Sequence, residues 1–543
     1  MTQKIISIFL WVAFLSTTSF SQDWKNYPYH EDETVITFPE DEGWHEGEAI
    51  EWWYTTAHLT GEETGNEYTV MLTYFYYDSL IFDGFRLLNI ANETTGAFYS
   101  DMKVCTYPTL ATDHLEIQAS LFPGGGNESW VTAKDENGDL LPFEYNISAA
   151  SNAGAIQLNY NTVKRPLIVG ETGLFNQGIV NYTYYYSLTG IEASGTLTLG
   201  NITEAVTGTA WIDRQYGSFN PLTGEKYEWF SLQLSNGMDI NLWNIFTVDN
   251  EIPPVQEYQM FSAYVNEDST FTTSDFHLKR LGYFITPDQQ RSYAKKWQLT
   301  SEIHDIDLVI TSINTNSELV QPFYFFEGGT SIEGTVDGME VTGVGFAELL
   351  HMYNHPEIQI ITPSDEWSAD QPISWELTNP DEGCPVSYTV EVSYDDKVSY
   401  NTIAQNLTDA SFLWDPSGFP QEALYWFRIT AYSIDSTLIG VTETSTSFPL
   451  TTGTGETTKD VFVKIYPNPT NEVIVLEWAS EAIGNFDIQL FNTMGQTVKS
   501  TSVKKNLSHY EMKIKDLEPG LFFIKISSKN MDLTKPVVIL NHQ

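Results

Sequence analysis

The 543-residue sequence contains little cysteine, and its two thiols belong to no recognisable pattern. Cys105 and Cys384 fall in different predicted domains, so we expect buried thiols rather than a disulfide between them. Neither belongs to a Cys-x-x-Cys pair, and the ten histidines are scattered along the chain. These absences exclude a zinc or haem signature, and we expect neither a metal ion nor another cofactor.

Positive charge is also scarce, since 26 Lys and Arg stand against 72 Asp and Glu, for a formal net charge of −46. Proteins bind nucleic acids and anionic lipids through clusters of Lys and Arg, which are absent from this sequence. The composition therefore excludes nucleic acid as a partner.

Long apolar runs are missing except near the N-terminus. There, Lys4 precedes the apolar run Ile5–Leu15, which is too short to cross a bilayer as a helix. Ser19 and Ser21 lie at the −3 and −1 positions of a cleavage site, so a signal peptide is predicted over 1–21. We expect no transmembrane segment and a mature protein that is secreted or held at the cell surface.

The charge balance changes abruptly near the C-terminus. From Lys459 to Gln543 the sequence has ten Lys, no Arg and nine Asp and Glu, a net charge of +1. A Gly/Thr-rich linker over 451–460 coincides with the change. The shift predicts a separate module over 461–543.

This module contains three motifs, in the order Ile465–Thr470, Phe491–Gln496 and Leu517–Ile526. In order and spacing they resemble the C-terminal sorting domain of type IX secretion, which is found in the Bacteroidetes. The resemblance implies that the type IX secretion machinery is a partner. It also implies that the protein is secreted or displayed on the surface of a Gram-negative bacterium. The alternative is a small β-sandwich without an export role.

Another β domain is predicted over 356–450. Tyr388, Val390 and Val392 alternate with polar residues, as a half-buried strand requires. Trp375 on an early strand and Tyr425–Tyr432 on a late one resemble the core strands of a fibronectin type III or similar immunoglobulin-like sandwich. We interpret the domain as a spacer, with binding of a glycan or a protein through its loops as the alternative.

The larger region upstream has dense strand signals and almost no helical ones. Residues 230–234 alternate into Asn236-Gly237 and residues 238–242 alternate out of it, the pattern of a hairpin with a primed turn. Antiparallel strands over so long a region must close or pair their edges, which predicts two tandem barrels of about eight to ten strands each. We place them over 35–222 and 223–355.

Two segments concentrate aromatic and charged residues: Glu51–Leu59 (EWWYTTAHL) and Gly208–Gly217 (GTAWIDRQYG). Further segments accompany them, namely Phe38-Pro39 with Asp41, Gly43 and His45, then Tyr184–Ser187, Ser194–Leu197, Glu228–Leu234 and Gly343–Leu349. Together they resemble the carotenoid 1,2-hydratase (hydroxyneurosporene synthase) and AttH-like family of lipocalin-like proteins, over about Phe38 to Tyr353. The predicted fold is therefore all-β: two tandem lipocalin-like barrels, an immunoglobulin/fibronectin III-like sandwich and a small C-terminal β-sandwich.

In the hydratases of that family, a carboxylic acid protonates an isolated double bond of an isoprenoid, and water captures the resulting carbocation. Such a site needs a buried carboxyl that stays protonated, aromatic faces around the cation and an apolar cavity. The candidate catalytic residues are Asp213, Tyr216 and Glu51. The candidate ligand-binding residues are Trp52, Trp53, Tyr54, Trp211 and His58.

Each candidate has a structural alternative. Asp213 can pair with a cation elsewhere, although Arg214 should point to the opposite face of the strand. Glu51 can be the partner of a buried cation, and Trp211 can be core. Two functions therefore stay open: a secreted enzyme acting on an apolar isoprenoid or lipid-like substrate at Asp213, or a non-catalytic lipocalin that binds an apolar ligand.

Overall fold

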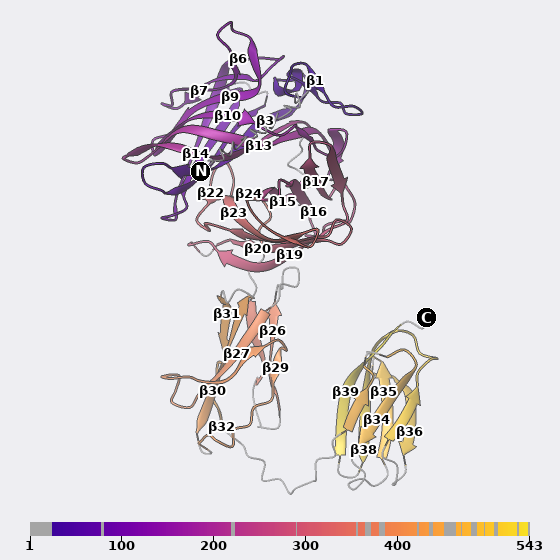
Figure 1. Cartoon of the computed structure of the whole chain (residues 1–543). Helices are drawn as coiled ribbons and strands as arrows, with labels where there is room; N and C mark the ends of the chain where they lie inside the picture. Colours follow the sequence, from indigo (N-terminus) through magenta and orange to yellow (C-terminus); the bar gives the residue numbers. More distant parts are fainter. Residues whose placement is uncertain are drawn as a thin grey trace, which may run out of the picture. The chain divides into compact units, whose positions relative to one another are not determined.

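The computed structural model describes residues 24–77, 81–218, 223–288, 290–353, 357–363, 371–378, 386–420, 423–433, 438–449, 463–468, 470–478, 486–492, 495–503, 509–528 and 531–540. The predicted signal peptide, Cys384 and the linker over 451–460 lie outside these residues. The chain divides into two compact units, Met1–Pro449 and Leu450–Gln543 (Figure 1). Within the described residues, no helix has the length and apolarity needed to cross a membrane.

A closed barrel of ten strands begins the first unit. Its strands are β3 (Ile50–Gly61), β4 (Glu67–Tyr76), β5 (Gly84–Asn92), β6 (Ala97–Leu110), β7 (Glu116–Phe122), β8 (Asn127–Lys134), β9 (Leu140–Ala150), β10 (Gly154–Thr162), β13 (Asn181–Leu199) and β14 (Ile202–Gly217). The barrel closes because β10 pairs with both β9 and β13. Every second residue points inward, so Trp53, Ala57 and Ile212 join one buried core.

Shorter elements decorate this barrel. They are β1 (Tyr29–His30), β2 (Thr37–Phe38), the 3₁₀ helix η1 (Glu40–Glu42), β11 (Leu167–Ile168) and β12 (Leu174–Gln177). The last two pair with β13, and β1 pairs with β2. Cys105 is a buried free thiol in the barrel core, as predicted.

A second sheet follows in the same unit. It contains β15 (Lys226–Leu234), β16 (Asp239–Phe246), β17 (Gln259–Asn266), β18 (Ser269–Thr273), β19 (His277–Ile285), β20 (Ser292–Ser301), β21 (Ile306–Ser312), β22 (Glu318–Leu319), β23 (Phe325–Val336) and β24 (Met339–Leu349). The predicted hairpin at Asn236-Gly237 joins β15 to β16, and Gly237 has a φ of 91°. The strand order is 18-17-16-15-24-23-21-20-19, with β22 beside β23.

This second sheet differs from the expected closed barrel, because β18 and β19 do not pair in the described part of the chain and the sheet is a half-barrel. Side chains donate hydrogen bonds to the backbone carbonyls of the segment between these two strands. Gln259 Nε2 donates to the carbonyls of Ser274 and Phe276 at 3.0 and 2.7 Å, and Ser301 Oγ donates to that of Asp275 at 2.9 Å. These acceptors are therefore satisfied without a neighbouring strand.

The two sheets pack face to face and bury a separate aromatic cluster between them (Figure 1). From the barrel, this cluster includes Tyr54, Tyr185 and Trp211; from the half-barrel it includes Trp229 and Phe346. Direct hydrogen bonds cross the interface, such as Tyr54 OH to Glu327 Oε1 at 2.6 Å. The outer face of β3 and β14 is consequently buried at Tyr54, Trp211 and Asp213.

The rest of the first unit is a β-sandwich. Its strands are β25 (Glu357–Thr362), β26 (Ile373–Thr378), β27 (Val386–Ser393), β28 (Asn401–Leu407), β29 (Ser411–Phe412), β30 (Leu424–Ser433), β31 (Leu438–Glu443) and β32 (Phe448–Pro449). Trp375 and Tyr425 are buried, as predicted. The Tyr425 hydroxyl donates to the carbonyl of Pro420, the tyrosine corner of immunoglobulin-like sandwiches.

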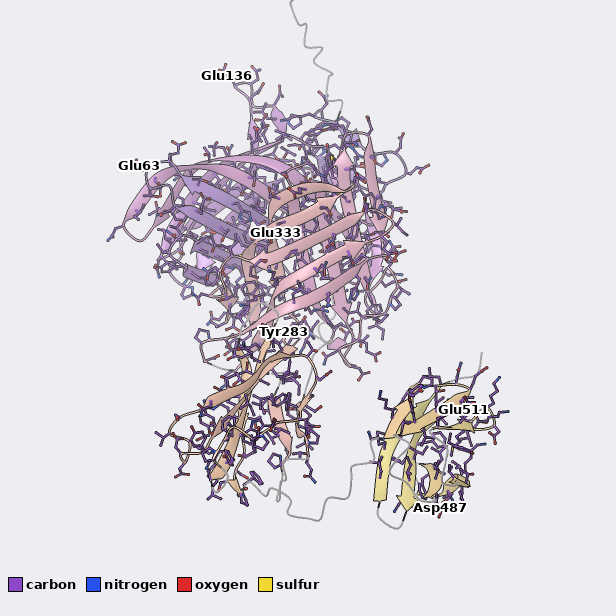
Figure 2. All side chains as sticks on the ribbon, turned by 60° about the horizontal axis from the view of Figure 1, so that its bottom comes forward. Glu63, Glu136, Tyr283, Glu333, Asp487 and Glu511 are labelled. Carbon is purple, nitrogen blue, oxygen red and sulfur yellow. The ribbon has the colours of Figure 1, made fainter. Side chains whose placement is uncertain are left out.

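The second unit is a smaller β-sandwich around a single core. It contains β33 (Val463–Tyr466), β34 (Val473–Trp478), β35 (Phe486–Asn492), β36 (Thr497–Val503), β37 (His509–Lys513), β38 (Gly520–Ser528) and β39 (Met531–Ile539). Its sheets have the orders 33-34-37 and 36-35-38-39. In the first unit, the acidic excess lies partly at the surface: Glu63, Glu136 and Glu333 are all exposed (Figure 2).

Candidate functional site

Strand β14 divides the candidate residues between its two faces. Trp211 and Asp213 point outward to the half-barrel, whereas Ile212 and Arg214 point into the barrel. The neighbouring strand β3 runs antiparallel, with Asp213 opposite Tyr54 and Tyr216 opposite Glu51. The two predicted strands are therefore adjacent, but their side chains form two separate networks.

Asp213 is buried and bound by three neutral donors. Its Oδ1 accepts hydrogen bonds from Trp211 Nε1 and Ser187 Oγ, both at 2.6 Å. Its Oδ2 accepts one from the Tyr185 hydroxyl at 2.5 Å. No Lys or Arg within the described residues forms an ion pair with this carboxyl.

The donors around Asp213 indicate where its own proton resides. Tyr185 must donate to Oδ2, because its oxygen already accepts from Trp229 Nε1 at 3.0 Å and Asn241 Nδ2 at 2.8 Å. Both lone-pair positions of Oδ1 are occupied, so the acidic proton belongs on the remaining position of Oδ2. Burial raises the pKa of Asp213 to about 7, against the lowering effect of its hydrogen bonds, and the charge of Glu348 adds to the rise.

Aromatic side chains surround this carboxyl. The rings of Tyr54 and Trp229 lie edge to face, with centroids 5.4 Å apart. Half-buried aromatics of the barrel and half-barrel continue from this cluster: Trp52, Phe75, Phe85, Phe98, Phe175, Tyr227 and Tyr258. His58 lies on the same face, where its Nε2 donates to the Gly345 carbonyl at 2.8 Å and burial lowers its pKa to about 4. His58 is thus a neutral interface residue.

Two glutamates that the sequence did not predict lie at the same interface. Glu327 on β23 is opposite Glu348 on β24, and both carboxyls are buried at the interface. Tyr54 donates to Glu327, and Tyr227 donates to Glu348. Burial raises the pKa of both glutamates, and that of Glu327 is raised further by the charge of Glu348. The pair therefore stays protonated at a higher pH than exposed glutamates do.

Replacing Glu348 by glutamine tests the coupling of this pair to Asp213. Glu348 disfavours ionised Asp213, so removing its charge should make Asp213 lose its proton more readily. We expect the pKa of Asp213 to fall below about 7 in Glu348→Gln, measured by NMR titration of aspartate carboxyl carbons. Glu333→Gln, on an exposed position of β23, is the control that should leave it unchanged. An unchanged or higher pKa in Glu348→Gln would refute the coupling.

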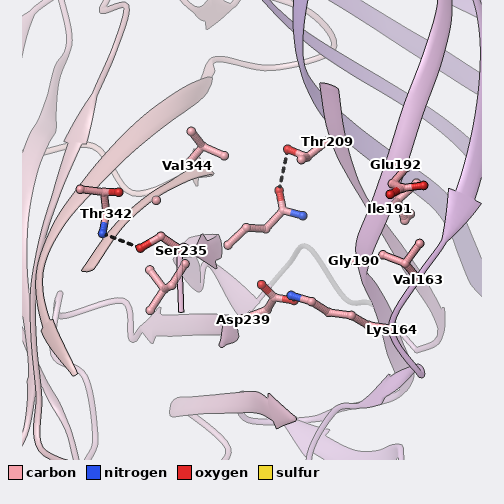
Figure 3. A pocket seen from close by; sticks show the side chains of 13 residues that line it. Val163, Lys164, Gly190, Ile191, Glu192, Thr209, Ser235, Asp239, Thr342 and Val344 are labelled. Atoms are coloured by element: carbon pink, nitrogen blue, oxygen red, sulfur yellow. Dashed lines mark hydrogen bonds and ion pairs between the residues drawn. The ribbon is translucent and has the colours of Figure 1, made fainter. Parts of the chain in front are cut away.

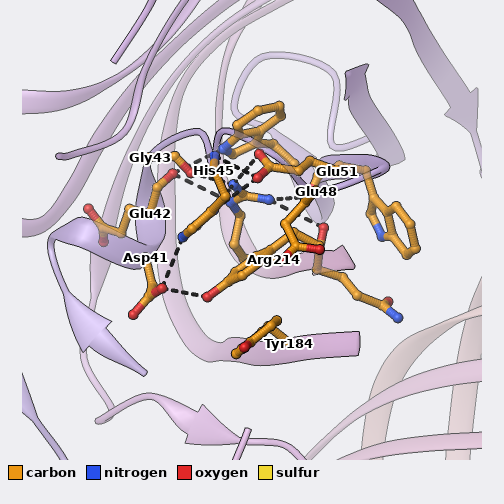
Figure 4. Close-up of polar contacts among 12 residues, drawn as sticks. Asp41, Glu42, Gly43, His45, Glu48, Glu51, Tyr184 and Arg214 are labelled. Atoms are coloured by element: carbon orange, nitrogen blue, oxygen red, sulfur yellow. Dashed lines mark hydrogen bonds and ion pairs between the residues drawn. The ribbon is translucent and has the colours of Figure 1, made fainter. Parts of the chain in front are cut away.

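The inner face of β14 carries the second network (Figure 4). Arg214 Nη2 lies 2.8 Å from Glu51 Oε2, and both side chains are fully buried. The guanidinium also lies over the Trp53 ring, 4.1 Å from its centroid. Strand alternation placed Arg214 away from Asp213, as expected from the sequence.

A bridge of His45 and Tyr216 extends this network to residues 41–45. His45 Nδ1 lies 2.9 Å from Glu51 Oε1, and its Nε2 lies 3.0 Å from Asp41 Oδ1. The Tyr216 ring stacks on His45 at 3.6 Å, and its hydroxyl donates to Asp41. Burial acts to lower the pKa of His45, but its hydrogen bonds to Asp41 and Glu51 raise it overall. Glu51 and Tyr216 thus bind the N-terminal segment to the barrel and do not contact Asp213.

A surface cleft of about 400 Å³ opens at another point of the interface (Figure 3). It is lined by the later part of β15, the middle of β13 and the earlier part of β24, and from β14 by Thr209, four residues before Asp213. Lys164 and Asp239 also line it, and Lys164 Nζ lies 2.5 Å from Asp239 Oδ2. At about 3.3 Å per residue, the cleft and Asp213 are on the order of 13 Å apart along the strand.

Two protein-family models match the chain. A protein-family model described as AttH-like matches residues 29–353, and one described as a secretion system C-terminal sorting domain matches residues 464–540. No curated protein matches the chain.

Solved structures give two similar proteins. A structure of an AttH protein from Nitrosomonas europaea is 20% identical with a TM-score of 0.49, covering 59% of this chain and 98% of its own. Kievitone hydratase from Nectria haematococca is 16% identical with a TM-score of 0.47, covering 60% of this chain and 93% of its own.

Proposed function

Because the chain belongs to the AttH-like family, we propose that it is an enzyme that adds water to an isolated double bond of an apolar, isoprenoid or lipid-like substrate. Asp213 is the general acid. The observation that carries the proposal is a buried carboxyl with three neutral donors, no cationic partner among the residues that the structure describes, and one position left for its proton. A carboxyl of this kind remains protonated near neutral pH and can donate.

The proposed reaction begins with transfer of the Oδ2 proton of Asp213 to one carbon of the double bond. The π bond breaks, a C–H bond forms and the neighbouring carbon becomes a carbocation. Tyr185, Ser187 and Trp211 then stabilise the new carboxylate, because all three already donate to it. Water attacks the cation and gives up a proton, which returns to Asp213. The sum is one water added per double bond, with the acid restored.

The surroundings of Asp213 favour this charge development. Tyr54, Trp52 and Trp229 present aromatic rings, whose faces attract a cation. Glu327 and Glu348 supply carboxylate character on the same side of the interface. Positive charge that develops between these groups is therefore stabilised by both.

The half-buried aromatic row also fits the second candidate, a carrier that binds an apolar ligand without changing it. Incubation with candidate terminal alkenes in ¹⁸O-labelled water distinguishes the two. An enzyme yields an alcohol that carries the label in mass spectrometry. A carrier returns the ligand unchanged in an organic extract of the protein.

The C-terminal unit is a type IX sorting domain, which assigns the protein to secretion or the cell surface. We propose that a signal peptide over 1–21 directs the first export step in a Gram-negative host of the Bacteroidetes. The type IX machinery then recognises the C-terminal unit.

Export should remove sequence from both ends of the chain. We expect the mature protein from the native host to lack residues 1–21 and the segment after roughly residue 458, because the C-terminal sorting domain begins just after the module boundary at Lys459. Intact-mass measurement of the native protein checks both ends. A full-length C-terminus would contradict the processing.

A further inference from the structure

Among the buried side-chain oxygen atoms of β16 that have no hydrogen-bond donor in the described part of the chain, two lie on the same face of the strand. They are Asp239 Oδ1 and Asn241 Oδ1, and both side chains are 0% exposed. The two residues are two apart on one strand and therefore share the face that packs on the barrel. An unpaired buried carboxyl or amide oxygen is costly, so each needs a donor.

The remaining polar atoms of these two residues bind different sets of partners. Asp239 Oδ2 accepts from Lys164 Nζ at 2.5 Å and from Thr189 Oγ1 at 2.6 Å. Lys164 and Asp239 line the surface cleft (Figure 3). Asn241 Nδ2 instead donates to Ser187 Oγ at 3.0 Å and to the Tyr185 hydroxyl at 2.8 Å.

Ser187 and Tyr185 are both direct donors to Asp213. A row of polar side chains with one break thus runs from the cleft to the buried acid, through Lys164, Asp239, Thr189, Asn241 and Ser187. We call this row the polar seam. Its one missing link is between Asp239 Oδ1 and Asn241 Oδ1, two acceptors that cannot bond to each other.

We propose that an ordered water molecule binds Asp239 Oδ1 and Asn241 Oδ1, and that the polar seam is the route by which water passes from the cleft to Asp213. Water is the small molecule that donates two hydrogens to two acceptors, and buried waters typically satisfy such groups. The catalytic meaning of the route rests on the proposed function, whereas the water site does not.

The charged groups around Asp239 support the entry of water from the cleft. Asp239 faces Lys164 from the segment after β10 and Thr189 from β13, and Tyr264 lies on the neighbouring β17. Burial raises the pKa of Asp239 to about 6, against the lowering effect of Lys164. The cleft end of the interface thus carries a titratable ion pair, in contrast to the aromatic row around Trp52 and Phe75. Water and an apolar substrate therefore approach Asp213 through different surroundings.

The proposed reaction requires water and the apolar substrate to reach Asp213 by separate routes. Each turnover consumes one water, and an apolar substrate packed on the aromatic row blocks water from that side. Water arriving along the polar seam meets Ser187 and Asn241 immediately before Asp213. It reaches the cation beside the carboxylate that recovers its proton.

A high-resolution crystal structure of the full chain tests the water site directly. We expect density for one water within hydrogen-bond distance of both Asp239 Oδ1 and Asn241 Oδ1. Direct protein donors to both oxygens, or no density there, would overturn the site.

Hydrogen exchange at Asp213 tests the route without any substrate. The infrared band of the protonated carboxyl is identified as the band lost in Asp213→Asn, and its exchange is followed after transfer to D₂O. Thr189→Val keeps the side-chain shape but removes the hydroxyl that donates to Asp239. We expect about tenfold slower exchange, the order of magnitude for one lost hydrogen bond.

Thr209→Val is the matched control, because Thr209 lines the cleft and donates to Gln233 outside the polar seam. It should exchange like the wild-type protein. Unchanged exchange in Thr189→Val, or equal slowing in Thr209→Val, would refute the route. Failure of the proposed function has a different signature, since no ¹⁸O label from water then enters the ligand, while the ordered water and the slower exchange in Thr189→Val remain.

Discussion

Asp213→Asn is expected to reduce turnover by a factor of about 10² to 10⁴, the contribution of a positioned general acid. The amide keeps the shape of the side chain, and its oxygen still accepts from Trp211 and Ser187. It has no acidic proton to give, so protonation of the double bond is lost while binding of the apolar substrate survives. The measurement is incorporation of ¹⁸O from labelled water, with ligand retention determined separately by mass spectrometry.

Glu42→Gln supplies a matched control for this variant. Glu42 is also a buried acid, and burial raises its pKa to about 7, but it lies inside the barrel with Tyr27 and Tyr145. Its amide should leave turnover unchanged. Equal turnover in Asp213→Asn and wild type would exclude the acid role. Loss of turnover in both variants would assign the effect to a damaged barrel.

Arg214→Met is expected to lower the free energy of unfolding of the barrel by about 3–5 kcal/mol, the cost of leaving one member of a buried ion pair alone. Arg214 and Glu51 are 1% and 0% exposed, and the guanidinium also donates to the carbonyl of Gly43. Its removal leaves the buried Glu51 carboxylate with His45 and weakens the attachment of residues 41–45 to the barrel. Hydrogen exchange of peptides from β14, followed by mass spectrometry, reports this loss locally in a chain with several domains.

Two further variants serve as comparisons for the loss of stability in Arg214→Met. The double change Arg214→Met with Glu51→Gln removes both charges, so it should be less destabilising than Arg214→Met alone. Arg428→Met breaks a half-exposed pair with Glu443 in the sandwich domain and should cost at most about 1 kcal/mol. A loss in Arg214→Met no larger than that in Arg428→Met would show that the inner network contributes little stability.

Local sequence patterns were sufficient for much of the fold. Alternation at period two predicted the strands, Asn236-Gly237 predicted a hairpin, and the family motifs predicted the order of the domains. The same alternation separated Asp213 from Arg214, because adjacent residues of a strand point to opposite faces. These features depend on near neighbours in the chain, which a sequence displays directly.

The candidate site depended on contacts that no local pattern contains. Alternation says which residues of β14 share a face, but it does not say that the outer face packs on the half-barrel. That packing brings Asn241 and Trp229 to Tyr185 and places Glu327 beside Tyr54. It also explains why Glu348 was missed, although its strand belonged to a recognised motif.

The sequence by itself determined the all-β fold, the family and sorting motifs, and the alternation that directs Asp213 and Arg214 to opposite faces. Only the tertiary structure decided that Glu51 and Tyr216 serve a network inside the barrel, that the second sheet stays open, and that a polar seam leads to Asp213. The physical reason is that burial and hydrogen bonding at this site come from the packing of two sheets. Their contacting residues are separated by tens to hundreds of positions, as Tyr54 and Glu327 are.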